Sequence, residues 1–176
     1  MGVQESEQEL QKLQVELARF LTSSGPVSNS EQLYGISLKE IELNRDTLYR
    51  KRLSQTKFWM PKTAAVLGIA FEVNFREFAI SHHFNGHKAI ALEAIGFAEW
   101  LAARTEYLPE DRPWIGELAC WETLDCRWHQ GAFFIRLFRF HYDFSRSNQF
   151  SEPPKRVQNW ICVRCFSWYR MIRLSM

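Results

Sequence analysis

The order of hydrophobic and polar positions predicts a chain that is helical first and β-stranded last. Apolar residues recur with helical spacing over residues 4–24, where a Gly-Pro pair ends the pattern. After a polar stretch with weak helical signal, Asn44 can cap a helix that runs to Trp59, and Pro61 starts another one. The first third of the chain is therefore expected to be α-helical.

Three further helices follow from the same spacing. Gly68 marks a break, and phenylalanines at i, i+4 and i+7 from Phe71 predict a helix beyond it. An apolar face predicts a helix over residues 88–103. Pro113 suits the first position of one more helix, which extends through Trp121.

The period changes in the last third of the chain. From 134 to 144 the even positions are aromatic or Arg and the odd positions turn polar at Arg139, which is the period of two of a half-buried strand. Runs at 160–168 and 169–174 predict two more strands. The segment 145–158 holds two adjacent prolines and no periodicity, so we expect an exposed, mobile loop there.

The predicted fold class is α+β, with a helical domain at residues 1–126 and a small antiparallel β unit at residues 127–176. Three strands alone are marginally stable in water, so the β unit must pack on a helix or on a partner. A hydrophobic content of 46% excludes a disordered protein, and no apolar run approaches the roughly 18 residues that span a bilayer. A polar N-terminus and four cysteines lead us to expect a cytoplasmic protein with reduced thiols.

Charge separates the same two parts. Residues 127–176 carry nine Lys and Arg against two acids, whereas residues 1–126 carry thirteen against eighteen. The basic segment also holds twelve of the 26 aromatic residues. Together these features predict a docking surface for an acidic or extended partner.

Six side chains of the β unit are the predicted partner-binding residues. An Arg within an apolar strand can hold an acidic partner, or it can reach a carboxylate or the rim of its own sheet. The set consists of Arg136, Arg139, Arg164, Arg170, Trp160 and Trp168.

The cysteines suggest a zinc site that their spacing disfavours. Cys120, Cys126, Cys162 and Cys165 could supply four thiolates. The last two lie in a predicted continuous strand, where positions i and i+3 point to opposite faces. Ordinary thiols and no bound metal are therefore expected.

Neither the histidines nor the acidic residues form a recognisable catalytic motif. His82, His83 and His87 lie in a link with an Asn-Gly pair, which favours a solvated loop over a metal or acid-sensing role. No catalytic triad order, phosphate-binding glycine loop or zinc-protease helix occurs in the sequence. We therefore expect a protein that is not an enzyme and needs no cofactor.

A second basic stretch offers a nucleic-acid alternative. Arg50, Lys51 and Arg52 lie next to Tyr49 and Trp59, and such a combination can contact a phosphate backbone. The ordinary interpretation is a solvated helix face. We expect weak binding to duplex DNA, or none, because the helical part is acidic and no recognition helix stands out.

Six segments carry a family resemblance: LQVELARFL, LYRKRLSQTKFWMPKTAAVLGIAF, FREFA, ALEAIGFAEWLAAR, VQNWICVRCFSW and RMIRL. In this order they resemble a family of small bacterial proteins that are encoded beside multinuclear non-heme iron oxidases and related to domains labelled DNA-binding. The resemblance spans about residues 10–174. The link SHHFNGHKAI departs from the family, in which this segment is often rich in Pro, Gly and Arg.

The resemblance implies a non-catalytic accessory protein. In such systems an iron oxidase modifies a ribosomally made precursor peptide, and the companion protein docks on the oxidase and presents the peptide. A leader peptide could be taken up as an added strand of the sheet. The DNA-binding label implies an alternative, a transcriptional regulator, and an unassigned protein-interaction domain is a third possibility.

Overall fold

The computed structural model describes residues 7–8, 11–12, 14–15, 38–82, 89–104, 108–109, 112–129, 133–145 and 152–174. The chain forms two compact units, residues 1–52 and residues 53–176. Most of the helix predicted over residues 4–24 lies outside the described residues, as do His83 and His87 of the histidine link. The six described positions before residue 38 are helical.

Helix α2, Leu38–Trp59, begins in the first unit. The prediction that Asn44 caps this helix is wrong, because the helix starts six residues earlier and Asn44 lies inside it. The residues before Asn44 include Lys39, Glu40 and Glu42, all good helix formers, and an acid in the first turn interacts favourably with the helix dipole. These local preferences extend the helix towards the N-terminus.

The helices of the second unit follow the predicted order. Gly68 adopts a positive φ of 56°, which a residue without Cβ tolerates, and the chain changes direction there between two helices. Pro61 occupies the first turn of its helix, as predicted. The elements are α3 (Pro61–Leu67), α4 (Ile69–Ser81), α5 (Ala89–Ala103), α6 (Ile115–Glu122) and the 3-10 helix η2 (Leu124–His129).

Aromatic side chains form the core between α4 and α5. Phe71, Phe75 and Phe78 share the buried face of α4 that their spacing predicts, and none of them is exposed to solvent. The ring of Phe97 on α5 lies edge-on to those of Phe71 and Phe75, with centroids 5.2 and 5.3 Å away. The edge-to-face geometry adds to the hydrophobic gain of burial.

Helices α5 and α6 approach each other closely at Gly116. A Cβ built on Gly116 would lie 2.8 Å from the Cα of Ala102, so only glycine fits at this crossing. The prediction that Pro113 occupies the first position of α6 is wrong, because the helix begins two residues later, at Ile115. Trp114 takes the N-cap position, and its carbonyl accepts the N–H of Leu118 at 2.9 Å.

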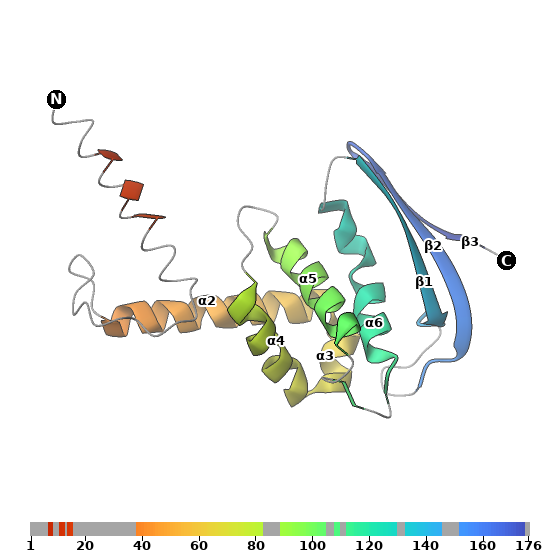
Figure 1. Ribbon diagram of the computed structural model, residues 1–176, viewed down its shortest axis with the longest axis horizontal. Helices are drawn as coiled ribbons and strands as arrows, with labels where there is room; N and C mark the ends of the chain where they lie inside the picture. Colours follow the sequence, from red (N-terminus) through yellow and green to blue (C-terminus); the bar gives the residue numbers. More distant parts are fainter. Residues whose placement is uncertain are drawn as a thin grey trace. The chain divides into compact units, whose positions relative to one another are not determined.

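The C-terminal strands form an antiparallel three-stranded sheet in the order β1 (Phe133–Tyr142), β2 (Lys155–Cys165) and β3 (Trp168–Leu174). The predicted α+β class, helical first and β last, is confirmed. The predicted loop at 145–158 is wrong for its last four residues, since β2 begins at Lys155. Within the second unit, β1 contacts α6 and β2 contacts η2, and Figure 1 shows the strands beside α6. No described helix is both long and apolar enough to cross a bilayer.

Candidate docking surface on the sheet

Two arginines share one carboxylate where the inner face of the sheet meets the helices. Arg127 of η2 is fully buried, and its Nη1 donates to Glu99 Oε1 on α5 at 2.6 Å. Arg136 of β1 places its Nη1 3.2 Å from the same oxygen. Both guanidinium groups also lie over the ring of Phe138, at 4.9 and 5.4 Å from its centroid.

Other inner-face contacts extend this attachment along the sheet. Tyr169 of β3 donates its hydroxyl to the carbonyl oxygen of Leu124 at 2.6 Å, and burial raises the pKa of this tyrosine. On β1, the backbone N–H of His141 donates to the carboxylate of Glu117 on α6 at 2.7 Å. The two edge strands, β1 and β3, are therefore each anchored to the helical layer by a hydrogen bond.

The outer face of the sheet is largely apolar, and among the described residues its side chains on the two edge strands are exposed. Phe133, Ile135 and Leu137, on alternate positions of β1, expose 68, 66 and 64% of their surface. The strand register continues these positions across the sheet: Leu137 pairs with Ile161, which pairs with Ile172. We use the name outer face for the set Phe133, Ile135, Leu137, Ile161, Val163, Trp168, Ile172 and Leu174.

Cations lie at the margins of the outer face, and acids are missing from the sheet. Arg139 and Arg170 are exposed on the same side of the sheet as the outer face, because the strand register places them at alternate positions with its residues. Lys155 and Arg156 are exposed at the start of β2. None of the three strands contains an Asp or a Glu. A partner that covers this face would meet apolar side chains flanked by positive charge.

The register divides the six predicted partner-binding residues between the two faces. Arg139, Arg170 and Trp168 share the outer side. The other three, Arg136, Arg164 and Trp160, share the inner side.

Contacts within the chain already engage this inner set. The Arg164 Nε donates to the Phe166 carbonyl at 2.9 Å, and the Trp160 Nε1 donates to Gln158 Oε1 at 3.1 Å. The side chain of Arg136 contacts Glu99 of the same chain, which is the alternative to an acidic partner expected for an Arg within an apolar strand.

The apolar part of the outer face was not predicted from the sequence. Phe133, Ile135 and Leu137 occupy odd positions of β1, whereas the prediction rested on the even positions and on the polar odd ones from Arg139 onward. A signal was present in the sequence, since both the odd and the even positions of residues 133–138 are apolar, apart from Arg136. Such a run is typical of a strand with both faces covered.

A buried carboxylate closes the end of β1. Asp143 is buried, and its backbone N–H donates to the Pro154 carbonyl at 2.9 Å. Burial alone would raise the pKa of Asp143, but hydrogen bonds from Ser145 together with the charge of Arg173 hold it below its ordinary value. This carboxylate is therefore expected to stay ionised in the folded protein near neutral pH.

The described thiols do not converge on a metal. Cys162 is buried and Cys165 is exposed on the continuous strand β2, and the described residues include no group of three His, Cys, Asp or Glu side chains placed to hold an ion. Burial raises the pKa of Cys120 to about 11 and that of Cys126 to about 12. Thiols with such pKa values are weak nucleophiles at neutral pH.

The nucleic-acid alternative lies in the first unit, on α2. Arg50 pairs with Asp46 one turn earlier, at 2.8 Å, while Lys51 is exposed and Arg52 is half-buried. An exposed i,i+4 pair of this kind neutralises part of the positive charge that a phosphate backbone would need.

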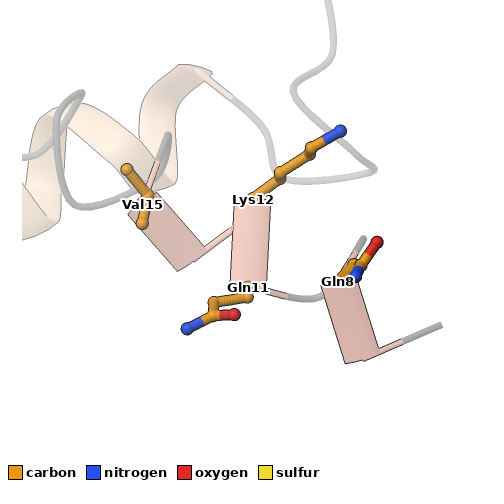
Figure 2. Close-up of a pocket in the computed structure, with 4 residues that line it drawn as sticks. All are labelled: Gln8, Gln11, Lys12 and Val15. Atoms are coloured by element: carbon orange, nitrogen blue, oxygen red, sulfur yellow. The ribbon is translucent and has the colours of Figure 1, made fainter. Parts of the chain in front are cut away.

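Two of the hollows in the described parts of the chain are large enough to consider as ligand sites. The first, near the N-terminus, is lined by Gln8, Gln11, Lys12 and Val15, and Figure 2 shows Gln11 and Lys12 pointing in different directions, so no polar groups converge there. The second, of about 240 Å³, lies in the second unit and is lined in part by Trp59, Trp121 and Trp160.

Comparisons with known proteins add no relative. No protein-family model, no curated protein and no solved structure matches this chain.

Proposed function

We propose that this chain is a non-catalytic accessory protein that docks on a partner protein through the outer face of its sheet. The observation that carries this proposal is a contiguous, exposed apolar sheet face with cationic margins and no acid on any strand. Monomeric proteins rarely expose large contiguous apolar patches, and those that do generally use them for binding. The complementary partner surface is apolar at its centre and acidic at its margin.

Covering this face would contribute several kcal/mol, on the order of the gain from a few buried side chains, towards the affinity of a complex. Full burial of a large aliphatic or aromatic side chain contributes roughly 1.5–3 kcal/mol. Phe133, Ile135 and Leu137 are about two-thirds exposed, so each would contribute about 1–2 kcal/mol on docking. These residues, with Trp168 and Ile172 beside them, can supply the apolar centre that interfaces use as hot spots.

The family resemblance supports a choice of partner. We propose a multinuclear non-heme iron oxidase as the docking partner and its precursor peptide as a second ligand. In the described sheet, β1 and β3 each have one neighbour only, so each offers an unpaired edge to which a peptide strand can add. The four free thiols fit a reducing compartment, and we place the complex in the cytoplasm.

The test is capture of the purified oxidase by matched variants of this chain. Ile135→Lys/Leu137→Lys introduces two charges on the outer face, and Ile69→Lys/Val73→Lys introduces the same charges on α4, where the exposed fractions are 87 and 61%. The first pair should weaken capture by about tenfold or more, whereas the control pair should leave it nearly unchanged.

Two results would overturn the proposal. One is equal capture by both pairs of variants, with helicity retained. The other is tight, sequence-selective binding of duplex DNA that is lost on replacing Arg50 and Arg52, which would favour the regulator instead.

Charge reversal at Arg139 and Arg170 should also weaken capture, and more strongly at low salt, because screening of exposed charges is least there.

A further inference from the structure

We propose that the 240 Å³ cavity beneath the sheet binds an organic cation, the ammonium or guanidinium group of a lysine or arginine side chain. The cavity lies where the end of α2, the end of α6 and the start of η2 meet the inner face of β2 and β3. The docking proposal concerns the opposite face and makes no use of it. The two proposals therefore stand or fall separately.

The walls of the cavity are aromatic. Trp59 comes from α2, Trp121 from α6 and Trp160 from the central strand β2, and Met171 of β3 adds a thioether. An indole face carries negative potential and attracts a cation more strongly than any other side-chain ring. Tryptophans contributed by three separate elements thus line a cavity that can attract a positively charged group.

Two carboxylates line the cavity, and burial raises the pKa of one of them, Glu122. Glu122 accepts hydrogen bonds from the backbone N–H groups of Lys62 and Thr63, at 2.7 and 2.8 Å, and from the Thr63 hydroxyl at 2.7 Å. These contacts fix its orientation and use three of about four acceptor positions of a carboxylate. Asp125 is exposed and also lines the cavity.

The charge pattern excludes the other ligand classes. An anion would meet both carboxylates, and a neutral apolar group would desolvate them without compensation. The Lys62 ammonium already lies 5.3 Å from the ring centroid of Trp121, within the range of a cation–π contact. The charge of Lys62 acts on Glu122, which leaves the exposed Asp125 carboxylate for an added cation.

The volume indicates a single side chain. Sites for cofactors and drug-sized ligands usually measure about 300–1,000 Å³. The cavity is smaller than that, about 240 Å³, and suits the end of one long side chain better than a cofactor. A lysine or arginine of a bound polypeptide presents its cation on a flexible apolar stem, which matches a cavity with aromatic walls and a charged rim.

The test uses the intact chain with ¹⁵N-labelled tryptophan and follows the indole N–H signals by NMR. The probes are glycine pentapeptides with Lys, Arg, norleucine or Glu at the centre, together with butylammonium as a free amine. The Lys or Arg peptide should shift the signals of Trp59, Trp121 and Trp160 saturably in the millimolar range, and the norleucine and Glu peptides should not.

Variants separate the cavity from the rest of the surface. Asp125→Asn should weaken the binding of the Lys peptide by about two- to fivefold, while the control Glu152→Gln, at an exposed acid outside the cavity, should leave it unchanged. Equal shifts by the norleucine and Lys peptides, or no shifts at all, would overturn the proposal. Shifts with butylammonium but with neither cationic peptide would overturn the assignment to a side chain. Oxidase capture is measured separately and decides only the docking proposal.

Discussion

The contact of Arg127 and Glu99 gives a sharp prediction about what holds the sheet on the helices. The Arg127 guanidinium is fully buried, and its Nε has no hydrogen-bond partner among the described residues. Its charge is balanced mainly by Glu99, at 2.6 Å. Glu99→Gln would leave that buried charge without its carboxylate, whereas Arg127→Met would remove the charge and keep much of the volume.

The two changes should therefore differ in cost. Removing one partner of a buried ion pair typically costs about 3–5 kcal/mol, while replacing a buried pair by apolar residues is often nearly neutral. Glu99 is 41% exposed, so water can approach and the cost of Glu99→Gln should fall to about 2–3 kcal/mol. We expect about 1 kcal/mol for Arg127→Met, since the cation–π contact with Phe138 is lost. The double variant should be more stable than Glu99→Gln alone.

Urea unfolding followed by circular dichroism, on all four members of this double-mutant cycle, measures these differences. Glu117→Gln is a suitable control, because it also removes a helix carboxylate that contacts β1 but leaves no buried arginine unpaired. A larger loss for Arg127→Met than for Glu99→Gln would refute the reasoning. So would a double variant less stable than either single one.

Four further predictions concern other parts of the chain. Gly116→Ala should lower the free energy of unfolding by about 1–3 kcal/mol in the same urea assay, because its Cβ would meet the backbone of Ala102; an unchanged midpoint would contradict the close helix crossing. The stability advantage of the wild type over Asp143→Asn should be present above about pH 4 and vanish as the pH falls through the lowered pKa of that carboxyl, as checked by thermal unfolding between pH 2 and 7 (a conventional range for such a scan). Iodoacetamide should modify Cys165 in the folded protein and Cys162 only after unfolding, as mass spectrometry would show. Gel shifts near physiological salt should detect only weak, sequence-independent binding of duplex DNA.

The sequence was sufficient for the helices with a strong one-sided pattern. The spacing of Phe71, Phe75 and Phe78 identified both the helix α4 and its buried face. The start of α2 was less predictable, because Asn44 is a good cap in isolation and only the continuation of the helix through Leu38 overrides that preference. The position of a helix end depends on small local differences in free energy. The buried face of a helix is set by a stripe of apolar residues, which is visible in the sequence.

The sheet shows what the sequence could not supply. The period of two in β1 located the strand, but the register with β2 and β3 decides which side chains share a face. Arg136 and Arg139 were both predicted to bind a partner, yet the first contacts Glu99 on the inner side and only the second is exposed on the outer side. The pair Arg127 and Glu99 lies 28 positions apart, and no local pattern indicates such a contact.

The two faces of the sheet lead to one consequence for function. A sheet with apolar side chains on both faces is normally covered by a layer on each side. Here the helices supply the inner layer, through contacts that include the buried Arg127, while the described residues leave Ile135 and Leu137 of the outer face exposed. An exposed apolar face gains little stability from burial and raises the risk of aggregation. A partner that provides the missing layer removes this liability, and since the strands bear only positive charge, that layer should be acidic at its margin.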